Sequence, residues 1–216
     1  SEMCIRDSGK LNPETPITRE EAFVVLARAF ALESGDTSVL NNYTDGASVS
    51  AWAQSSVAAL IENGYVNGAN GKLNPKTSIT RAEFAAIAAR FDDKNTDTSS
   101  KFTDIASHWA KNEIGIAANK GWINGYPDGT FRPNQYITRA EAMTLVNRVL
   151  NRLPENSSDL LDSMIKWPDN SDASAWYYLA VQEATNSHAY SDKSKDDKYE
   201  KWTTIRDARD WTELEK

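Results

Sequence analysis

The stretch Ile137-Thr138-Arg139-Ala140-Glu141 decides the fold, because the chain contains it in three versions. It recurs as Ile79-Thr80-Arg81-Ala82-Glu83 and, with one change, as Ile17-Thr18-Arg19-Glu20-Glu21. The copies lie about 60 residues apart, and self-similarity at a fixed period indicates a repeat architecture. We therefore expect equivalent modules and interpret each residue together with its counterparts.

Each copy has the form Thr-x-x-Glu followed by apolar residues at helical spacing. In such a capping box the Thr hydroxyl accepts a hydrogen bond from the third helical N–H, and the Glu accepts one from the Thr N–H. The pattern predicts three equivalent helices, each with a buried apolar stripe. The residues of the boxes are Thr18, Glu21, Thr80, Glu83, Thr138 and Glu141.

Two arginine sets recur in all three copies. An Arg just inside the helix start opposes the helix dipole, so we expect this first set to serve something other than helix stability. It consists of Arg19, Arg81 and Arg139. The second set, further along each helix, is interpreted as ion-pair partners or solvated residues. It consists of Arg28, Arg90 and Arg148.

A second helix is predicted upstream in each complete copy, over about residues 51–63 and 108–120. Each begins after an aromatic-Thr-Asp segment and ends at a Gly that is suited to a C-cap, Gly64 or Gly121. A Gly-x-x-x-Pro loop then leads to the capping box. One unit is thus two helices joined by a long loop, and the expected fold class is all-α with little or no strand.

The repeats predict the organisation of the chain. Trp167-Pro168-Asp169 and Trp176-Tyr177 echo the first half of a unit, so we hypothesise that the tail docks beside repeat one and completes a pseudo-threefold ring. We expect short helical stretches over 157–166 and 203–214 and a charged loop over 191–198. The predicted segments are a tail or non-native segment 1–8, the second half of repeat one with a polar linker 9–42, repeat two with its linker 43–101, repeat three 102–152, and a tail with a partial fourth repeat 153–216.

The bulk composition excludes several classes of protein. A net charge of -7 argues against non-specific nucleic-acid binding, and no apolar run is long enough to span a membrane. Cys4 is the single cysteine, so no intrachain disulfide forms. No signal peptide is visible, so we expect one upstream if the protein is exported.

Catalytic and metal-binding patterns are also missing. His108 and His188 are the only histidines, and neither lies near a nucleophile motif. Asp93, Asn95 and Asp97 weakly resemble a calcium loop, but the required Gly and the final Glu are absent, and a solvated linker is the favoured interpretation. The chain is therefore predicted to be no enzyme and to need no cofactor or metal.

The combination of Phe102-Thr103-Asp104, His108-Trp109-Ala110, Gly125-Tyr126-Pro127-Asp128-Gly129-Thr130-Phe131, Pro133 and the Ile-Thr-Arg-Ala-Glu box resembles the S-layer homology domain. The resemblance covers about residues 9–152. It implies a three-repeat helical bundle that anchors a bacterial surface protein, of the clostridial kind, to the cell wall. In that family, grooves between repeats bind secondary cell-wall polysaccharide, often through a pyruvylated terminal sugar.

Carried over to this chain, the resemblance implies a set of polysaccharide-binding residues. Arg offers a planar donor fork to a carboxylate, Trp stacks on a sugar ring, Asp accepts from hydroxyls and Gly permits close backbone approach. The set is Arg19, Arg81, Arg139, Asp45, Asp104, Trp52, Trp109, Gly68 and Gly125.

Each member of this set has a structural alternative. The arginines suit buried ion pairs between repeats, the Trp residues suit core packing, and the Asp residues suit helix caps or turns. A second function also stays open, in which the grooves contact other copies of the protein in a surface lattice. The sequence favours an extracellular wall anchor with cell-wall polysaccharide as its partner, and no membrane insertion.

Overall fold

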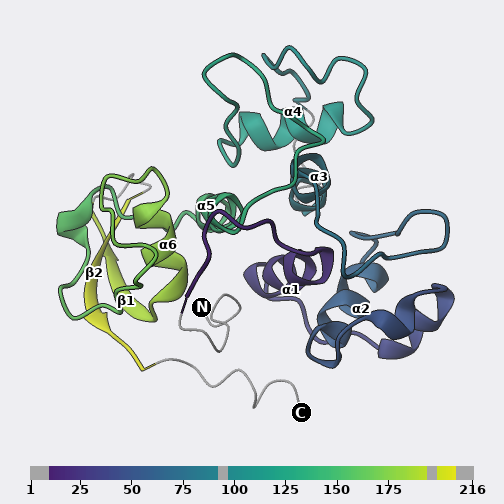
Figure 1. Cartoon of the computed structure of the whole chain (residues 1–216), viewed down its shortest axis with the longest axis horizontal. Helices are drawn as coiled ribbons and strands as arrows, with labels where there is room; N and C mark the ends of the chain where they lie inside the picture. The colour runs from purple at the N-terminus through teal and green to yellow at the C-terminus, as the bar shows by residue number, and fades with distance from the viewer. Residues whose placement is uncertain (1–9, 92–96, 194–198, 208–216) are drawn as a thin grey trace. The chain divides into compact units, whose positions relative to one another are not determined.

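The computed structural model describes residues 10–91, 97–193 and 199–207. The described part is mostly helical, with one small sheet (Figure 1). It forms two compact units: residues 16–137, and residues 1–15 together with 138–216. The α-helices are α1 (Arg19–Ala29), α2 (Gln54–Glu62), α3 (Arg81–Arg90), α4 (Lys111–Asn119), α5 (Arg139–Val149) and α6 (Tyr178–Thr185), and the strands are β1 (His188–Asp192) and β2 (Glu200–Ile205).

Capping boxes begin α1, α3 and α5, as the sequence predicts. In α3 the Thr80 N–H donates to Glu83 Oε2 over 2.9 Å, and the Glu83 N–H donates to Thr80 Oγ1 over 3.2 Å. Two N–H groups at the helix start are satisfied in this way, which fixes the point where each helix begins. The sequence therefore predicted the starts of the three equivalent helices correctly.

Helices pack across the repeat boundary. The second helix of one repeat lies beside the first helix of the next, as α1 with α2 and α3 with α4 in one unit, and α5 with α6 in the other (Figure 1). α2 and α4 are followed by Gly64 and Gly121, whose φ values of 74° and 72° confirm the expected left-handed C-cap positions. Short 3-10 helices, Gly46–Ser48 and Ala51–Ala53, precede α2.

A ring of backbone hydrogen bonds joins the three boxes inside the unit of residues 16–137. The Ile17 N–H donates to Ile137 O over 3.2 Å, Ile79 N–H to Ile17 O over 3.1 Å, and Ile137 N–H to Ile79 O over 3.0 Å. All three side chains are buried. Each repeat thus supplies one donor and one acceptor, and the pattern closes on itself with threefold pseudosymmetry.

The early Asp of each repeat clamps the loop that precedes the capping box. Asp45 accepts from the Leu73 and Asn74 N–H groups over 2.8 Å each, and Asp104 accepts from the Phe131 and Arg132 N–H groups. In the other unit, Asp169 of the tail accepts from the N–H groups at positions 11 and 12, over 3.1 and 2.7 Å. The tail therefore makes to repeat one the contact that the other repeats make internally, as the docking hypothesis requires.

The end of the tail differs from the expectation. Residues 200–205 form strand β2, which pairs antiparallel with β1, in place of the helix expected from residue 203. Trp202 is buried and stacks on His188 of β1 with ring centroids 4.0 Å apart, while its neighbours Lys201 and Thr203 are exposed. This alternation, together with the β-branched residues 203–205, favours a strand over a helix. Residues 208–216 lie outside the described part.

Other loop expectations also change. The loop expected over 191–198 starts later, because β1 runs to Asp192, and the helical stretch expected over 157–166 is a 3-10 turn, Ser157–Asp159, followed by non-helical chain. The linker 34–42 contains a 3-10 helix, Thr37–Asn42, with Asp36 as its N-cap. Of the weak calcium pattern, positions 93 and 95 lie outside the described residues.

Among the described residues, no helix has the length and apolar character needed to cross a bilayer.

Candidate functional site

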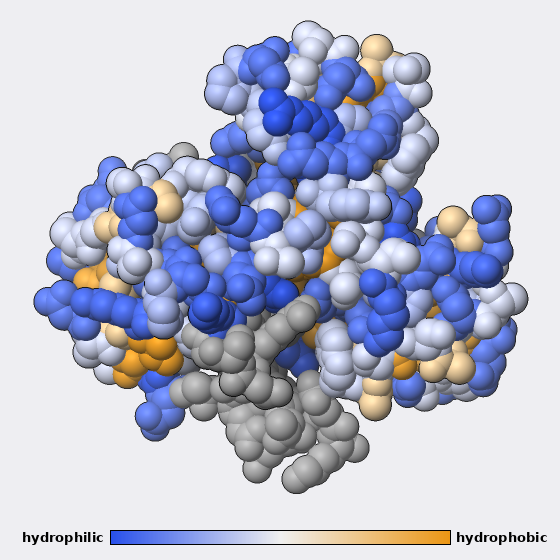
Figure 2. Space-filling view, viewed as in Figure 1, coloured by the Kyte–Doolittle hydropathy of each residue, from blue (hydrophilic) through white to orange (hydrophobic). Residues whose placement is uncertain are grey.

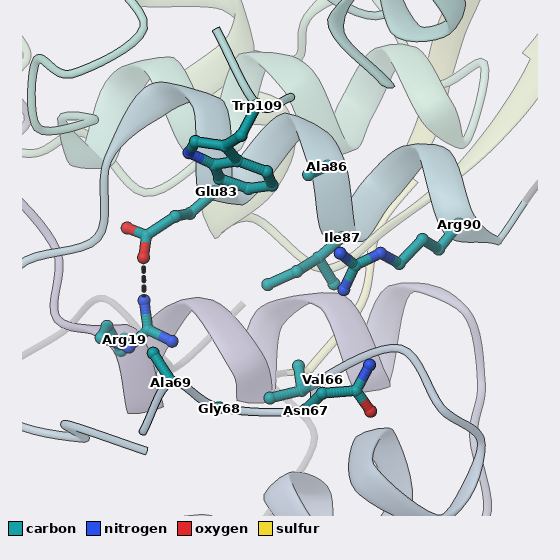
Figure 3. Close-up of a pocket in the computed structure, with 10 residues that line it drawn as sticks. All are labelled: Arg19, Val66, Asn67, Gly68, Ala69, Glu83, Ala86, Ile87, Arg90 and Trp109. Carbon is teal, nitrogen blue, oxygen red and sulfur yellow. Dashed lines mark hydrogen bonds and ion pairs between the residues drawn. The ribbon is translucent and has the colours of Figure 1, made fainter. Parts of the chain in front are cut away.

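A groove opens in the unit of residues 16–137, beside the start of α1 (Figure 3). Its volume is about 300 Å³, the low end of the range of roughly 300–1,000 Å³ for small-molecule sites. We call it the Trp109 groove. Its lining residues are Arg19, Val66, Asn67, Gly68, Ala69, Glu83, Ala86, Ile87, Arg90 and Trp109.

Arg19, Gly68 and Trp109 of the predicted binding set lie together in this groove. They come from α1, from the loop after α2 and from the segment before α4, so each repeat contributes one of them. The Trp109 side chain is 60% exposed, which leaves a large ring face open to a ligand. Trp52, at the equivalent place before α2, is 40% exposed and is not among the groove residues.

The Arg19 guanidinium is already engaged by the protein. Its Nε donates to Leu73 O over 2.7 Å, and Nη1 pairs with Glu83 Oε1 over 2.5 Å, the contact drawn as a dashed line in Figure 3. Glu83 uses its other oxygen for the Thr80 capping box. The contacts with Leu73 and Glu83 hold the Arg19 side chain between repeats one and two, where it is only 12% exposed. Glu83 balances its charge.

Arg81 and Arg139 are buried at the starts of α3 and α5. Arg81 repeats the Arg19 contact, since its Nε donates to Phe131 O over 2.9 Å, and Nη2 donates to Asn124 O over 3.2 Å. Its guanidinium also lies over the ring of Tyr126. Arg19 and Arg81 therefore each hold the loop of the following repeat, which explains why a cation stands at these two helix starts. Ligand contact by Arg81 and Arg139 stays a prediction.

Asp45 and Asp104 use both carboxylate oxygens on backbone amides, as described above. Partial burial acts to raise the pKa of Asp45, but the two amide hydrogen bonds outweigh it and keep the pKa below its usual value. Both groups hold the loops that shape a groove. Their contact with sugar hydroxyls stays a prediction.

Gly68 and Gly125 have no room for a side chain. A Cβ on Gly68 would lie 2.5 Å from Lys72 O, and Gly68 also has a φ of +66°. A Cβ on Gly125 would lie 2.3 Å from Cε1 of Phe102. Gly68 thus brings backbone to the edge of the Trp109 groove, and its close approach to a ligand stays a prediction.

Three polar groove residues are missing from the predicted set, Asn67, Glu83 and Arg90, and Glu83 is interpreted from the sequence as a cap. Arg90 ends α3, is exposed and donates from Nη1 to Tyr65 O over 2.7 Å. Its recurrence with Arg28 and Arg148 was the signal that could have marked it. From the sequence, this second arginine set is interpreted as ion-pair partners or solvated residues. Helical periodicity does not show that the loop at residues 65–69 lies against the end of α3.

A second polar cluster lies in the unit that contains the tail. His188 Nε2 lies 3.0 Å from Glu200 Oε1 and 3.2 Å from Glu183 Oε2, and all three residues are buried. Arg152 contacts all three, with Nη2 2.9 Å from His188 Nε2 and 3.1 Å from Glu183 Oε1, and Nε 3.4 Å from Glu200 Oε2. Trp202 Nε1 donates to Glu183 over 2.8 Å. No sequence motif marked these scattered residues.

The charges of this cluster explain its protonation. His188, Glu183 and Glu200 are a donor set that suits a metal ion, but the Arg152 guanidinium supplies a positive charge to the same atoms. Burial lowers the pKa of His188, but the two carboxylates outweigh it and raise that pKa to about 9. Burial raises the pKa of Glu183. Burial also acts to raise the pKa of Glu200, but the hydrogen bond from His188 outweighs burial and the pKa of Glu200 is lowered. Two carboxylates, one guanidinium and one imidazolium balance without an ion.

Comparison with known proteins agrees with this architecture. Residues 42–85 and 101–143 match the S-layer homology domain family. The chain is 34% identical over 207 residues to cell surface glycoprotein 1 of Acetivibrio thermocellus, covering 89% of this chain and 9% of that protein. It is 34% identical over 192 residues to the cellulosome-anchoring protein of the same organism, covering 84% of this chain and 41% of that protein.

A third similar protein is the exoglucanase XynX of Acetivibrio thermocellus, 33% identical over 109 residues, which cover 47% of this chain and 10% of the enzyme. The chain thus spans less than half the length of these relatives. The two matched segments fall on the second and third repeats, which carry the Asp clamps, the Gly turns and the capping boxes. Through residues 42–85 and 101–143, the chain belongs to the S-layer homology domain family.

Proposed function

We propose that this chain anchors a larger protein to the bacterial cell wall by binding an acidic wall polysaccharide, without forming a covalent bond, in the Trp109 groove. The single observation that carries the proposal is the composition of that groove. An exposed Trp ring, two arginines, one glutamate and a side-chain amide converge on a space of about 300 Å³. Aromatic faces and arginine forks are the groups that recognise sugar rings and carboxylates.

Local charge favours an acidic ligand although the whole chain is acidic. Three of the groove's lining residues carry charge, Arg19, Glu83 and Arg90, so the groove has a net charge of about +1. The chain as a whole has a net charge of -7. A pyruvate ketal on a terminal sugar presents a planar carboxylate that suits a guanidinium fork. We therefore propose pyruvylated secondary cell-wall polysaccharide as the ligand.

The family and its relatives support a non-catalytic module located outside the cell, at the cell wall. The relatives include a cellulosome-anchoring protein, the middle cell wall protein of Brevibacillus brevis and a surface layer protein of Brevibacillus choshinensis. The enzymes among them, an exoglucanase and an amylopullulanase, match this chain over only 10% and 8% of their own lengths. Such a short shared segment is consistent with an accessory region separate from catalysis.

The face of the described residues that Figure 2 shows has no broad apolar area that would favour assembly. The face drawn in Figure 2 is mainly hydrophilic over the described residues, and its apolar residues form small separate patches. Stable self-association buries larger contiguous apolar areas. The Trp109 groove, by contrast, supports polysaccharide binding.

Co-sedimentation with purified wall sacculi tests the proposal. Wild-type chain should pellet with untreated sacculi and stay in solution after the secondary polysaccharide has been stripped. Trp109→Ala should weaken pelleting about tenfold or more, because the exposed ring contributes stacking and not core packing. Tyr136→Ala is the matched control, since Tyr136 is also an exposed aromatic residue of this unit and lies outside the groove. Equal pelleting with stripped and untreated sacculi would refute the polysaccharide anchor.

A further inference from the structure

The two arginines of the Trp109 groove differ in what they offer a ligand. Arg19 is bound at both ends of its guanidinium, by Leu73 O through Nε and by Glu83 through Nη1. Among the described residues, these two bonds leave the Nη2 donors of Arg19 unused, but a ligand carboxylate there would share the guanidinium with Glu83, whose second oxygen is held by the capping box of α3. Two carboxylates beside one guanidinium repel each other, and Glu83 already balances the charge of Arg19. Arg19 therefore gains little by binding an acid group.

Within the described residues, Arg90 uses only a small part of its hydrogen-bonding capacity. A guanidinium has five N–H donors, and Arg90 gives one to Tyr65 O through Nη1. Within the described part of the chain, no carboxylate pairs with it. The Tyr65 bond fixes the direction of the side chain, and Figure 3 shows its guanidinium turned back along α3 toward the groove, near Ile87. A planar fork that is oriented in advance loses less entropy when a carboxylate binds.

The charge balance leads to the same residue. Glu83 neutralises Arg19, so the net positive charge of the groove belongs to Arg90. Two apolar, largely buried side chains line the groove: Ile87 of α3 beside the Arg90 guanidinium, and Val66 of the loop across from it (Figure 3). Ile87 is one turn before Arg90 on α3, so the two lie on one helix face. A carboxylate at Arg90 would therefore have apolar surface beside it.

We propose that Arg90 is the specificity-determining residue of the Trp109 groove and receives a sugar-borne carboxylate whose apolar substituent packs against Val66 and Ile87. Arg19 is then a positioning residue, which together with Glu83 holds α1, α3 and the loop at residue 73 in register. This inference rests on the proposed function and deepens it. It assigns acid recognition to the second arginine set and not to the set at the helix starts.

The test compares two forms of one ligand on the full chain. The probes are wall polysaccharide released from sacculi and the same polysaccharide after mild acid has removed its pyruvate ketals. Affinities are measured by titration calorimetry for the wild type, Arg90→Gln, Arg90→Lys and Arg28→Gln. The last variant removes the same charge at the equivalent position of α1, outside the groove.

Wild type and Arg28→Gln should bind the acidic form ~10- to 100-fold more tightly than the deketalised form, the range expected for hydrogen bonds to a charged group. Arg90→Gln should bind both forms with the weaker affinity, and Arg90→Lys should recover only part of the preference, because an ammonium lacks the fork. Melting temperatures within about 2 °C of wild type would show that the fold is unchanged, since Arg90 is exposed.

The outcomes separate this inference from the proposed function. Arg90→Gln with an undiminished preference for the acidic form would overturn the assignment to Arg90 and leave the anchor function standing. A wild type that binds both forms equally well would overturn the assignment and the proposed pyruvylated ligand, and would leave only the wall-anchoring role standing. A wild type that binds neither form would refute the proposed function and the inference together. Loss of the preference in Arg28→Gln as well would show an effect of net charge and would also overturn the assignment.

Discussion

Replacing His188 by Gln should remove a pH-dependent part of the stability of the tail. In the native chain two carboxylates, Glu183 and Glu200, raise the pKa of His188 from 6.5 to about 9. A group whose pKa is higher in the folded state than in the unfolded state stabilises the folded state. This stabilisation is complete at pH values below the unfolded-state pKa. The contribution is then lost as pH rises through the folded pKa. The window for His188 therefore runs from about pH 6.5 to about pH 9.

The size of the effect follows from that shift. About 2.5 pKa units at 1.36 kcal/mol each give roughly 3 kcal/mol as an upper bound. The loss should be smaller in practice, because Arg152 Nη2 lies 2.9 Å from His188 Nε2 and can donate to the neutral ring. The raised pKa of Glu183 acts in the opposite direction at neutral pH, since burial penalises its charged form. We therefore expect a net loss of about 1–3 kcal/mol.

The assay is urea unfolding of the wild type and of His188→Gln at several values between pH 6 and pH 10, with hydrogen exchange at β1 and β2 as a local readout. The difference in unfolding free energy between the two proteins should shrink as pH rises through about 9. Using the difference cancels the titration of groups that both proteins share. A difference that stays constant over this range would refute the protonated cluster, and one that grows with pH would show that His188 is neutral in the folded chain.

Two further substitutions test the fold itself. Asp169→Asn leaves one acceptor oxygen for the two N–H groups at positions 11 and 12, so we expect a loss of about 1–2 kcal/mol in urea unfolding and faster amide exchange at those positions. Unchanged exchange there would show that the tail does not hold repeat one. Thr80→Val removes the hydroxyl that caps α3 and should cost about 1 kcal/mol, measured as a lower denaturation midpoint. An unaltered midpoint would mean that the cap contributes nothing to α3.

The sequence by itself determined the local structure of the repeats. Capping boxes, apolar periodicity and C-terminal glycines are set by residues within a few positions of one another, so the starts of α1, α3 and α5 were predicted correctly. Of the predicted binding set, the structure brings Arg19, Gly68 and Trp109 into one groove, and helical periodicity cannot show which carbonyl or carboxylate a distant arginine meets. Arg19 was identified as a groove residue, whereas its partner Glu83, 64 residues away, was interpreted only as a cap.

Only the tertiary structure decided how the repeats meet. The hydrogen-bond ring through Ile17, Ile79 and Ile137, and the clamp from Asp169 to residues 11 and 12, join segments separated by 58 to 158 residues. It also decided that the end of the tail is a hairpin, since burial of Trp202 against His188 adds to the weak strand preference of residues 203–205. Contacts between distant residues depend on the packing of the whole chain, and a single sequence carries no local signal for them.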